Sequence, residues 1–290
     1  MKTLIIGASG LVGGALYHQF RKKSHQVVGT YNTYKVDPFI SLDITNKEQA
    51  EKTIADFGPD VVLSPAAFAH VDKCEQEPQL CRLVNVNGIK NLIDTIRNIN
   101  TQFVFFSTDY VFDGKSGPYK EEDRTNPINL YGKLKLEVEE YIKDHLDRYL
   151  IIRTANVFGW ERQNKNFVVN LISKNKRGEK MRIVNDQFGS PTYAPQLAQA
   201  IYCLVSDSRT GLYHVAGRSV IDRYSFALEV ADVFDLDKSL ISSITTSQLG
   251  QKVPRPQKGG LIIDKVEKVL PFKMYTSKEA LAEMKKDDII

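Results

Sequence analysis

The chain opens with the stretch KTLIIGASGLVGGAL, residues 2–16. Residues 4–6 form a short apolar run rich in β-branched side chains, which predicts a buried strand. Gly7, Gly10 and Gly13 follow at once, and a helical pattern begins after them. Such a turn lets backbone approach a ligand, and the free N–H groups of the helix start attract anions. The stretch therefore predicts a phosphate-binding turn, although its G-x-x-G-x-x-G spacing differs from the usual dinucleotide fingerprint, and a turn used only for close packing is the alternative.

Length and charge set broad limits. The 290 residues suffice for one large domain or two modest ones. A net charge of +4 is mild and indicates no nucleic-acid partner. The densest basic run, Lys174 to Arg182, predicts a solvated helix end and loop, with a phosphate clamp as the alternative. The start of the chain runs directly into a strand and no apolar run has the length of a membrane helix, so we expect a cytoplasmic protein without a membrane partner.

Cysteines and histidines give no sign of a metal or a disulfide framework. Cys74, Cys81 and Cys203 contain no C-x-x-C pair, which predicts three reduced thiols. The histidines are scattered without metal-ligand spacing, so no metal is expected.

Strand and helix patterns alternate through the first half of the chain. Short continuous apolar strands separated by helices are typical of a parallel sheet covered on both faces, so we predict an α/β fold with a Rossmann-like doubly wound sheet. Thr45 and Glu48 predict a capping box at one helix start. The ligand crevice should lie at the carboxyl ends of the strands. Further strands are predicted at 26–31, 61–63, 103–106 and 149–153, and helices at 11–22, 45–57, 87–99 and 130–145.

The pattern loosens past about residue 156, where prolines divide the chain into loops. We therefore predict an NAD(P)-binding domain over residues 1–155 and a mainly substrate-binding domain over residues 156–290, with some segments returning to the first domain. A capping box of Thr276 and Glu279 marks the last helix. Helices are predicted at 167–175, 194–205, 224–234 and 278–286, and strands at 181–184 and 212–215.

Tyr131 and Lys135 lie one helical turn apart, on the apolar face of the predicted helix 130–145. An inward-pointing lysine is costly unless it has a partner or a function. As an ammonium group it would hold a cofactor ribose and lower the pKa of Tyr131, whose phenol would exchange a proton with a substrate oxygen. Thr108, at the end of a predicted strand, would hydrogen-bond that oxygen. The alternative is a core tyrosine beside a lysine that reaches out to solvent.

Together these motifs resemble the extended short-chain dehydrogenase/reductase superfamily, and within it the dTDP-4-dehydrorhamnose reductase family. The resemblance covers nearly the whole chain. Its further pieces are AHVDKCEQEP (69–78), VNVNG (84–88), STDYVFDG (107–114), RTANVFG (153–159), NDQFGSPTYA (185–194) and GLYHVAG (211–217).

The resemblance implies reduction of the 4-keto group of a nucleotide-linked deoxy sugar, first of all dTDP-4-dehydrorhamnose. NAD(P)H would deliver hydride to C4 while Tyr131 protonates the oxygen, with Thr108 and Lys135 as the other catalytic residues. A homodimer is compatible with the family. The implied cofactor contacts are Gly7, Ser9, Gly10, Leu11, Val12, Gly13, Asn32, Lys35, Asp43, Ile44, Ala66, Ala67, Phe68, Tyr131 and Lys135. The implied substrate contacts are Thr108, Asp109, Tyr110 and Asn166.

Two details refine the implied reaction. Tyr110 stands where the superfamily's sugar 4,6-dehydratases carry a glutamate, so no base for dehydration is evident. Residues 29–32, at the end of the predicted second strand, contain no carboxylate to bond the ribose hydroxyls of NAD, and Lys35 is near enough in sequence to meet a 2′-phosphate. The sequence therefore favours NADP(H) over NAD(H).

Departures from the family pattern leave alternatives open. Residues 64–67 read Ser-Pro-Ala-Ala where the family often has Asn-Ala-Ala, and Asn156 stands where it often has an aromatic residue, with Trp160 four residues later. The same family includes the regulatory β subunit of methionine adenosyltransferase, which binds NADP and an enzyme partner. A nucleotide-sugar epimerase, which would hold its cofactor tightly, is the third interpretation.

Overall fold

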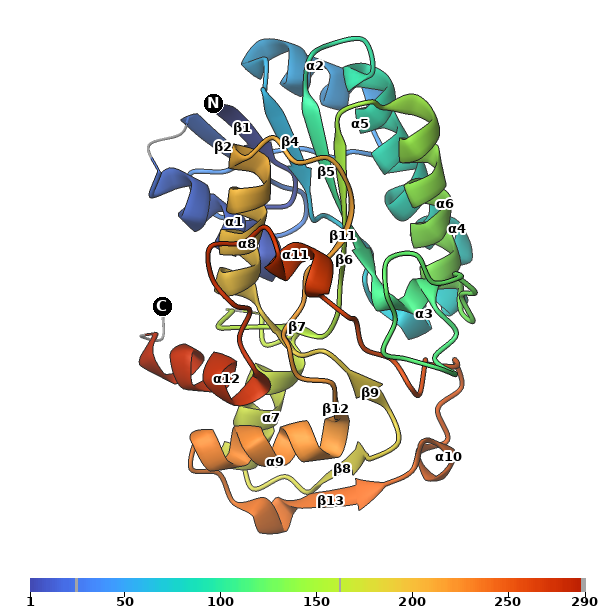
Figure 1. Cartoon of the computed structure of the whole chain (residues 1–290), viewed down its shortest axis with the longest axis vertical. Coiled ribbons are helices and arrows are strands. Elements are labelled where there is room, and N and C mark those ends of the chain that lie inside the picture. Colours follow the sequence, from blue (N-terminus) through green and yellow to red (C-terminus); the bar gives the residue numbers. More distant parts are fainter. Residues whose placement is uncertain (24–25, 162, 288–290) are drawn as a thin grey trace.

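The computed structural model describes residues 1–23, 26–161 and 163–287. Its main element is a seven-stranded parallel sheet in the order β11-β6-β5-β4-β1-β2-β3, which confirms the predicted doubly wound α/β fold (Figure 1). The strand order reverses beside β1, and ligands of such sheets bind at that point. The strands are β1 (Lys2–Ile5), β2 (Gln26–Tyr31), β3 (Ile40–Ser41), β4 (Val61–Ser64), β5 (Gln102–Thr108), β6 (Tyr149–Thr154) and β11 (Gly211–His214).

Helices cover both faces of this sheet (Figure 1). One face carries α1 and α8, and the other carries α2, α5 and α6. Because the sheet is covered on both sides, every residue of β4 and β5 is buried, which explains their continuous apolar runs. The bounds of these helices are α1 (Leu11–Arg21), α2 (Lys47–Phe57), α5 (Gly88–Ile96), α6 (Leu130–His145) and α8 (Ala194–Ser206).

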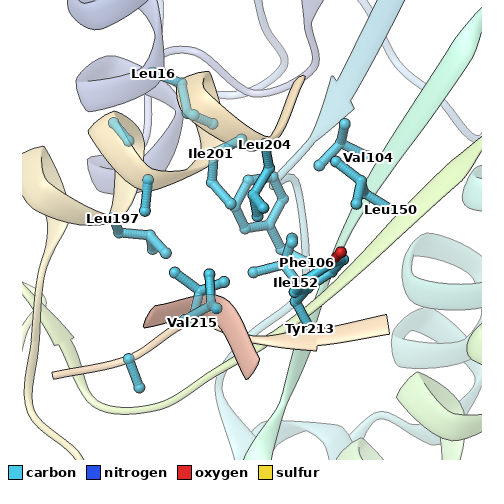
Figure 2. Close-up of a cluster of buried hydrophobic side chains, with 14 of the residues drawn as sticks. Leu16, Val104, Phe106, Leu150, Ile152, Leu197, Ile201, Leu204, Tyr213 and Val215 are labelled. Atoms are coloured by element: carbon cyan, nitrogen blue, oxygen red, sulfur yellow. The ribbon is translucent and has the colours of Figure 1, made fainter. Parts of the chain in front are cut away.

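The core between α1, α8 and the sheet fixes the strands that carry the site. In Figure 2, Leu16 of α1 and Ile201 of α8 point toward Phe106 of β5 and Ile152 of β6. All four side chains are buried. Burying each stabilises the fold by about 1.5–3 kcal/mol. The carboxyl ends of β5 and β6 therefore have firm support.

A smaller layer packs below the carboxyl ends of the sheet (Figure 1). Its hydrophobic core includes Val168, Phe226 and Leu281, which come from three different helices. Its two-stranded pairs are β7 (Val157–Phe158) with β10 (Thr192–Tyr193), β8 (Met181–Val184) with β13 (Ile241–Ile244), and β9 (Phe188–Gly189) with β12 (Ile221–Asp222). Its helices are α7 (Phe167–Lys176), α9 (Arg223–Val233) and α12 (Ser277–Lys286). Strand β11, α8 and α11 (Asp264–Glu267), although they come from the second half of the chain, pack on the main sheet.

Short helical segments complete the chain. They are α3 (Val71–Gln76), α4 (Pro78–Arg82), a π-helical turn (Leu83–Asn87), α10 (Thr246–Leu249) and two 3-10 turns (Asp109–Val111 and Lys238–Leu240). Along the described parts of the chain, no helix has the length and apolarity needed to cross a membrane.

The two expected capping boxes have different outcomes. Thr276 and Glu279 form the predicted box at the start of α12. The box of Thr45 and Glu48 is wrong, because Asn46 caps α2 by accepting a hydrogen bond from the Gln49 N–H. Thr45 instead bonds Asp43, through its N–H and its hydroxyl.

The expectation of three reduced thiols is wrong for one pair. Cys74 of α3 and Cys81 of α4 form a disulfide, while Cys203 is a free thiol. The short connection between α3 and α4 places the two Cα atoms 5.1 Å apart. That separation lies within the range a disulfide spans, and it follows from the fold rather than from any sequence spacing.

Candidate active site

The glycine turn between β1 and α1 combines tight packing with an open helix end. Gly7 has a φ of +80°, and its N–H donates to the Thr30 hydroxyl at 3.0 Å. A Cβ at Gly13 would lie 2.2 Å from the Gly7 carbonyl oxygen, so α1 can approach β1 this closely only with glycine there. Gly10 stands at the helix start with no side-chain cap, which leaves backbone N–H groups free for an anion.

A hollow of about 690 Å³ opens beside this turn. Ser9, Gly10 and Leu11 line one end of it, and Tyr34 from the loop after β2 lines its wall. Asn32 and Lys35 of the same loop are exposed, and the Lys35 ammonium lies 3.9 Å from the Asp37 carboxylate. Their assignment to a 2′-phosphate stays a prediction.

The other expected cofactor residues line the same edge of the sheet. Ala66 lies against the glycine turn, since a Cβ at Gly7 would be 3.0 Å from the Ala66 Cβ. The backbone of Phe68 is held by the Asn85 side chain, which accepts from its N–H at 2.8 Å and donates to its carbonyl at 3.0 Å. Ile44 is buried beside the edge. The cofactor role of these residues stays a prediction.

Strand β5 and helix α6 bring the three expected catalytic residues together. Thr108 is the last residue of β5, and Tyr131 lies in the first turn of α6. A Cβ at Gly132 would be 2.1 Å from the Tyr110 carbonyl oxygen, so glycine is needed for this approach. As a result the rings of Tyr131 and Tyr110 meet edge to face, with centroids 6.2 Å apart.

Lys135 is buried beneath Tyr131, as the helical spacing predicts, with only 2% of its surface exposed. Its ammonium group donates to the Phe106 carbonyl at 2.8 Å and lies 4.6 Å from the centre of the Phe105 ring. Burial lowers the pKa of Lys135 to about 7, and the negative charge of Glu139 acts in the opposite direction. Lys135 is therefore poised between its charged and neutral forms near neutral pH.

Asp109 sets the electrostatics around the tyrosine. It is buried, and the Thr108 hydroxyl donates to its carboxylate at 3.1 Å. Burial raises the pKa of Asp109 to about 7. Burial, and then the charges of Asp109 and Tyr110, raise the pKa of Tyr131 above its usual value, opposite to the lowering expected from Lys135. Tyr131 is consequently a neutral phenol that can donate a proton.

A second cavity of about 440 Å³ lies between the sheet and the smaller layer, next to Tyr110. Three arginines line it: Arg182 of β8, Arg223 of α9 and Arg255 from the segment before α11. Phe167 forms an apolar wall, and the Arg223 guanidinium lies 4.7 Å from the centre of its ring. The cavity therefore combines positive charge with a flat aromatic surface.

Sequence reasoning missed two of these arginines. Arg255 lies between two prolines and donates to the Asp72 carboxylate at 2.6 Å, across a long separation in sequence. Arg223 simply begins a helix. Arg182 belongs to the basic run for which the solvated interpretation was preferred, and it lines the cavity from an exposed position. The flanking prolines of Arg255 were the only local signal of a fixed loop.

Three residues after β6 that the sequence singled out, Asn156, Trp160 and Asn166, have structural contacts. Asn166 caps α7, and its amide donates to the Gly159 carbonyl at 2.9 Å, so its substrate contact stays a prediction. Trp160 donates to the Met284 carbonyl of α12 at 2.8 Å and does not line the arginine cavity. Asn156 adopts a left-handed backbone with a φ of +45°.

Comparison with known proteins places the chain in a family. The model of the RmlD substrate binding domain matches residues 1–289. The spore coat polysaccharide biosynthesis protein SpsK of Bacillus subtilis is 34% identical, over 88% of this chain and 87% of its own length. The methionine adenosyltransferase 2 subunit beta of Xenopus tropicalis is 31% identical, over 92% and 82%. A crystal structure of dTDP-4-dehydrorhamnose reductase from Bacillus anthracis in complex with NADP superposes with a TM-score of 0.89, 27% identity and 98% coverage of both chains. The chain belongs to the RmlD substrate binding domain family.

Proposed function

We propose that this chain reduces the 4-keto group of a nucleotide-linked deoxy sugar, first of all dTDP-4-dehydrorhamnose. It is an oxidoreductase that uses NADP(H). The observation that carries the proposal is the meeting of Thr108, Tyr131 and Lys135 at the sheet edge that also carries the glycine turn. A proton donor, a hydrogen-bond donor and a buried cation are the groups that reduction of a ketone requires beside a hydride source.

Each of the three side chains has a distinct task. Bound NADPH would supply the hydride. The neutral phenol of Tyr131 donates its proton to the C4 oxygen, and the Thr108 hydroxyl turns from Asp109 to the same oxygen. Lys135 would stabilise the phenolate that remains and would hold the ribose of the bound cofactor. These residues fit the cofactor because the buried lysine otherwise has only the Phe106 carbonyl as its hydrogen-bond partner in the described structure.

The arginine cavity supports a substrate with a diphosphate. Guanidinium groups pair with phosphate oxygens in a fixed, two-pronged geometry. Arg223 and Arg255 line the same cavity as Tyr110, whose ring contacts that of Tyr131, so a diphosphate there would place the attached sugar toward Tyr131. Burial raises the pKa of the Tyr110 phenol, and the charges of the two arginines act in the opposite direction. Phe167 lines the same cavity and carries the Arg223 guanidinium 4.7 Å from its ring centre, so it holds that arginine where a phosphate would bind.

Steady-state oxidation of NADPH, and separately of NADH, with dTDP-4-dehydrorhamnose tests the proposal. We expect turnover that is faster with NADPH and is abolished by Tyr131→Phe. Binding of NADPH without turnover of any dTDP-4-keto sugar would favour the regulatory-subunit interpretation, which the similarity to methionine adenosyltransferase 2 subunit beta keeps open. A cofactor that stays bound through purification and cycles without net oxidation would favour the epimerase.

A further inference from the structure

Helix α6 carries a third polar residue below Tyr131 and Lys135, at the same four-residue spacing. Glu139 is fully buried, and Arg153 of β6 is only 2% exposed. The Arg153 guanidinium grips both carboxylate oxygens, with N–O distances of 3.0 and 2.6 Å. The Ser107 hydroxyl donates to the same carboxylate. Three donors from two neighbouring strands thus hold one side chain of the catalytic helix.

These contacts tie α6 to two consecutive residues of β5, directly before Thr108. The Phe106 carbonyl accepts from Lys135, the Ser107 hydroxyl bonds Glu139, and the next residue is Thr108. Ser107 is also the register partner of Arg153 on β6. Because the helix grips the two residues before Thr108, it fixes the position of the Thr108 hydroxyl relative to Tyr131.

A contribution to folding stability does not by itself explain the buried ion pair of Glu139 and Arg153. Removing two charges from water costs several kcal/mol each, and apolar side chains of similar size are often as stabilising. The titratable groups that act on Lys135 are Glu139, through its charge, and Tyr131, whose ring centre lies 5.9 Å from the ammonium group. Arg153 of β6 faces Glu139, and Asp109 and Tyr110 of the 3-10 turn act on Tyr131. Of these, Glu139 is the one whose charge opposes the effect of burial on the pKa of Lys135.

We propose that Glu139, held by Arg153 and Ser107, is a positioning residue for reduction: it fixes α6 against β5 and so places Lys135 and Thr108 relative to Tyr131. The catalytic meaning of this inference rests on the proposed function. The effect on the charge of Lys135 does not, because it exists without substrate.

The test compares Glu139→Gln with Glu137→Gln. Glu137 lies on the same helix and also pairs with an arginine, Arg82, but at the surface and away from the site. In protein labelled with carbon-13 lysine, NMR of the side-chain Cε follows Lys135, which titrates at about pH 7 in the native chain. Glu139→Gln should lower that midpoint by about one pH unit or more. Glu137→Gln should leave it unchanged, and Glu139→Asp, which keeps the charge, should restore most of it.

Activity adds a second readout. Because Lys135 must be protonated, the alkaline fall in kcat of Glu139→Gln should move to lower pH, with about a tenfold loss of kcat above neutral pH and a smaller loss below it. A residue with only a structural role would lower stability without moving either titration.

The variant Glu139→Gln leaves Arg153 as an unpaired buried charge, so circular dichroism first checks that it is folded. If it is not, Arg153→Met and the double variant Glu139→Gln/Arg153→Met replace it, because these two differ only in the charge of Glu139, and Lys135 should titrate at lower pH in the double variant. Folded protein in which Lys135 titrates at the same pH with and without the Glu139 charge overturns the inference. If the native chain fails to turn over dTDP-4-dehydrorhamnose, the proposed function fails, while the lysine titration still decides the role of Glu139.

Discussion

The two sides of the site are built in different ways. The catalytic side consists of β5 and α6, which lie close in sequence and are joined by buried bonds such as the one from the Lys135 ammonium to the Phe106 carbonyl. The arginine side draws its residues from β8, α9 and the segment before α11, which long stretches of chain separate (Figure 1). The reacting groups therefore lie at the end of a buried strand and on the helix packed against it. The groups proposed to bind the nucleotide lie on segments far apart in sequence, which side-chain pairs such as Arg255 with Asp72 hold together.

The largest effect is expected on the catalytic side. Tyr131→Phe removes the proton donor but leaves the ring and its contact with Tyr110. We expect kcat to fall by about 10²–10⁴-fold, the usual contribution of a general acid. The Kd of NADPH, measured by fluorescence titration, should change little. An equal loss in kcat and in NADPH affinity would contradict the role of proton donor.

A smaller, different effect is expected on the arginine side. Arg223→Gln or Arg255→Gln removes a charged donor from the cavity, and such hydrogen bonds are worth about 1.5–3 kcal/mol. The KM of the sugar nucleotide should rise by about 10–100-fold, with kcat nearly unchanged. Arg218→Gln is the matched control, because Arg218 pairs with Glu279 at the surface. A fall in kcat with an unchanged KM would instead assign these arginines a role in the chemical step.

Asp109 allows the catalytic side to be tested through the free energy of unfolding, because burial disfavours the charged form of its carboxyl group. Its pKa is about 7 in the folded chain, against an ordinary value of 3.8 for an aspartate carboxyl. Between these values the folded state keeps a proton that the unfolded state has lost, so the free energy of unfolding falls as pH rises, and it is level above pH 7. Asp109→Asn lacks this penalty.

Urea unfolding at a series of pH values measures the effect. The stability curves of Asp109→Asn and the native chain should meet in acid, and the variant should be more stable above neutral pH by up to about 4 kcal/mol. A native chain whose stability relative to the variant does not change with pH would show that Asp109 titrates normally.

The smallest effect is expected for Lys35, which is predicted to meet the 2′-phosphate of NADP(H). The Lys35 side chain is 69% exposed and pairs only loosely with Asp37. Lys35→Ala should therefore raise the KM of NADPH by about threefold and leave that of NADH unchanged, because an exposed ion pair is worth less than about 1 kcal/mol. An equal change for both cofactors would remove Lys35 from the 2′-phosphate site.

The sequence predicts the catalytic side well because its signals are local. The apolar run of β5, the helical spacing of Tyr131 and Lys135, and the glycine turn each depend on neighbouring residues. It predicts the arginine side poorly, since the cavity exists only where distant segments meet, as Arg255 and Asp72 do. The disulfide of Cys74 and Cys81 was missed for a different reason: the two thiols are seven residues apart, but only the turn between α3 and α4 brings them together.

Transfer of deuterium is the most direct test of the account. NADPH carrying deuterium at its reactive carbon is oxidised with dTDP-4-dehydrorhamnose, and the product is examined by NMR and mass spectrometry. Hydride delivery beside Tyr131 predicts one deuterium at C4 of the sugar for each NADPH oxidised, and no product with Tyr131→Phe. Product without deuterium at C4, or oxidation of NADPH that Tyr131→Phe leaves intact, would contradict the account.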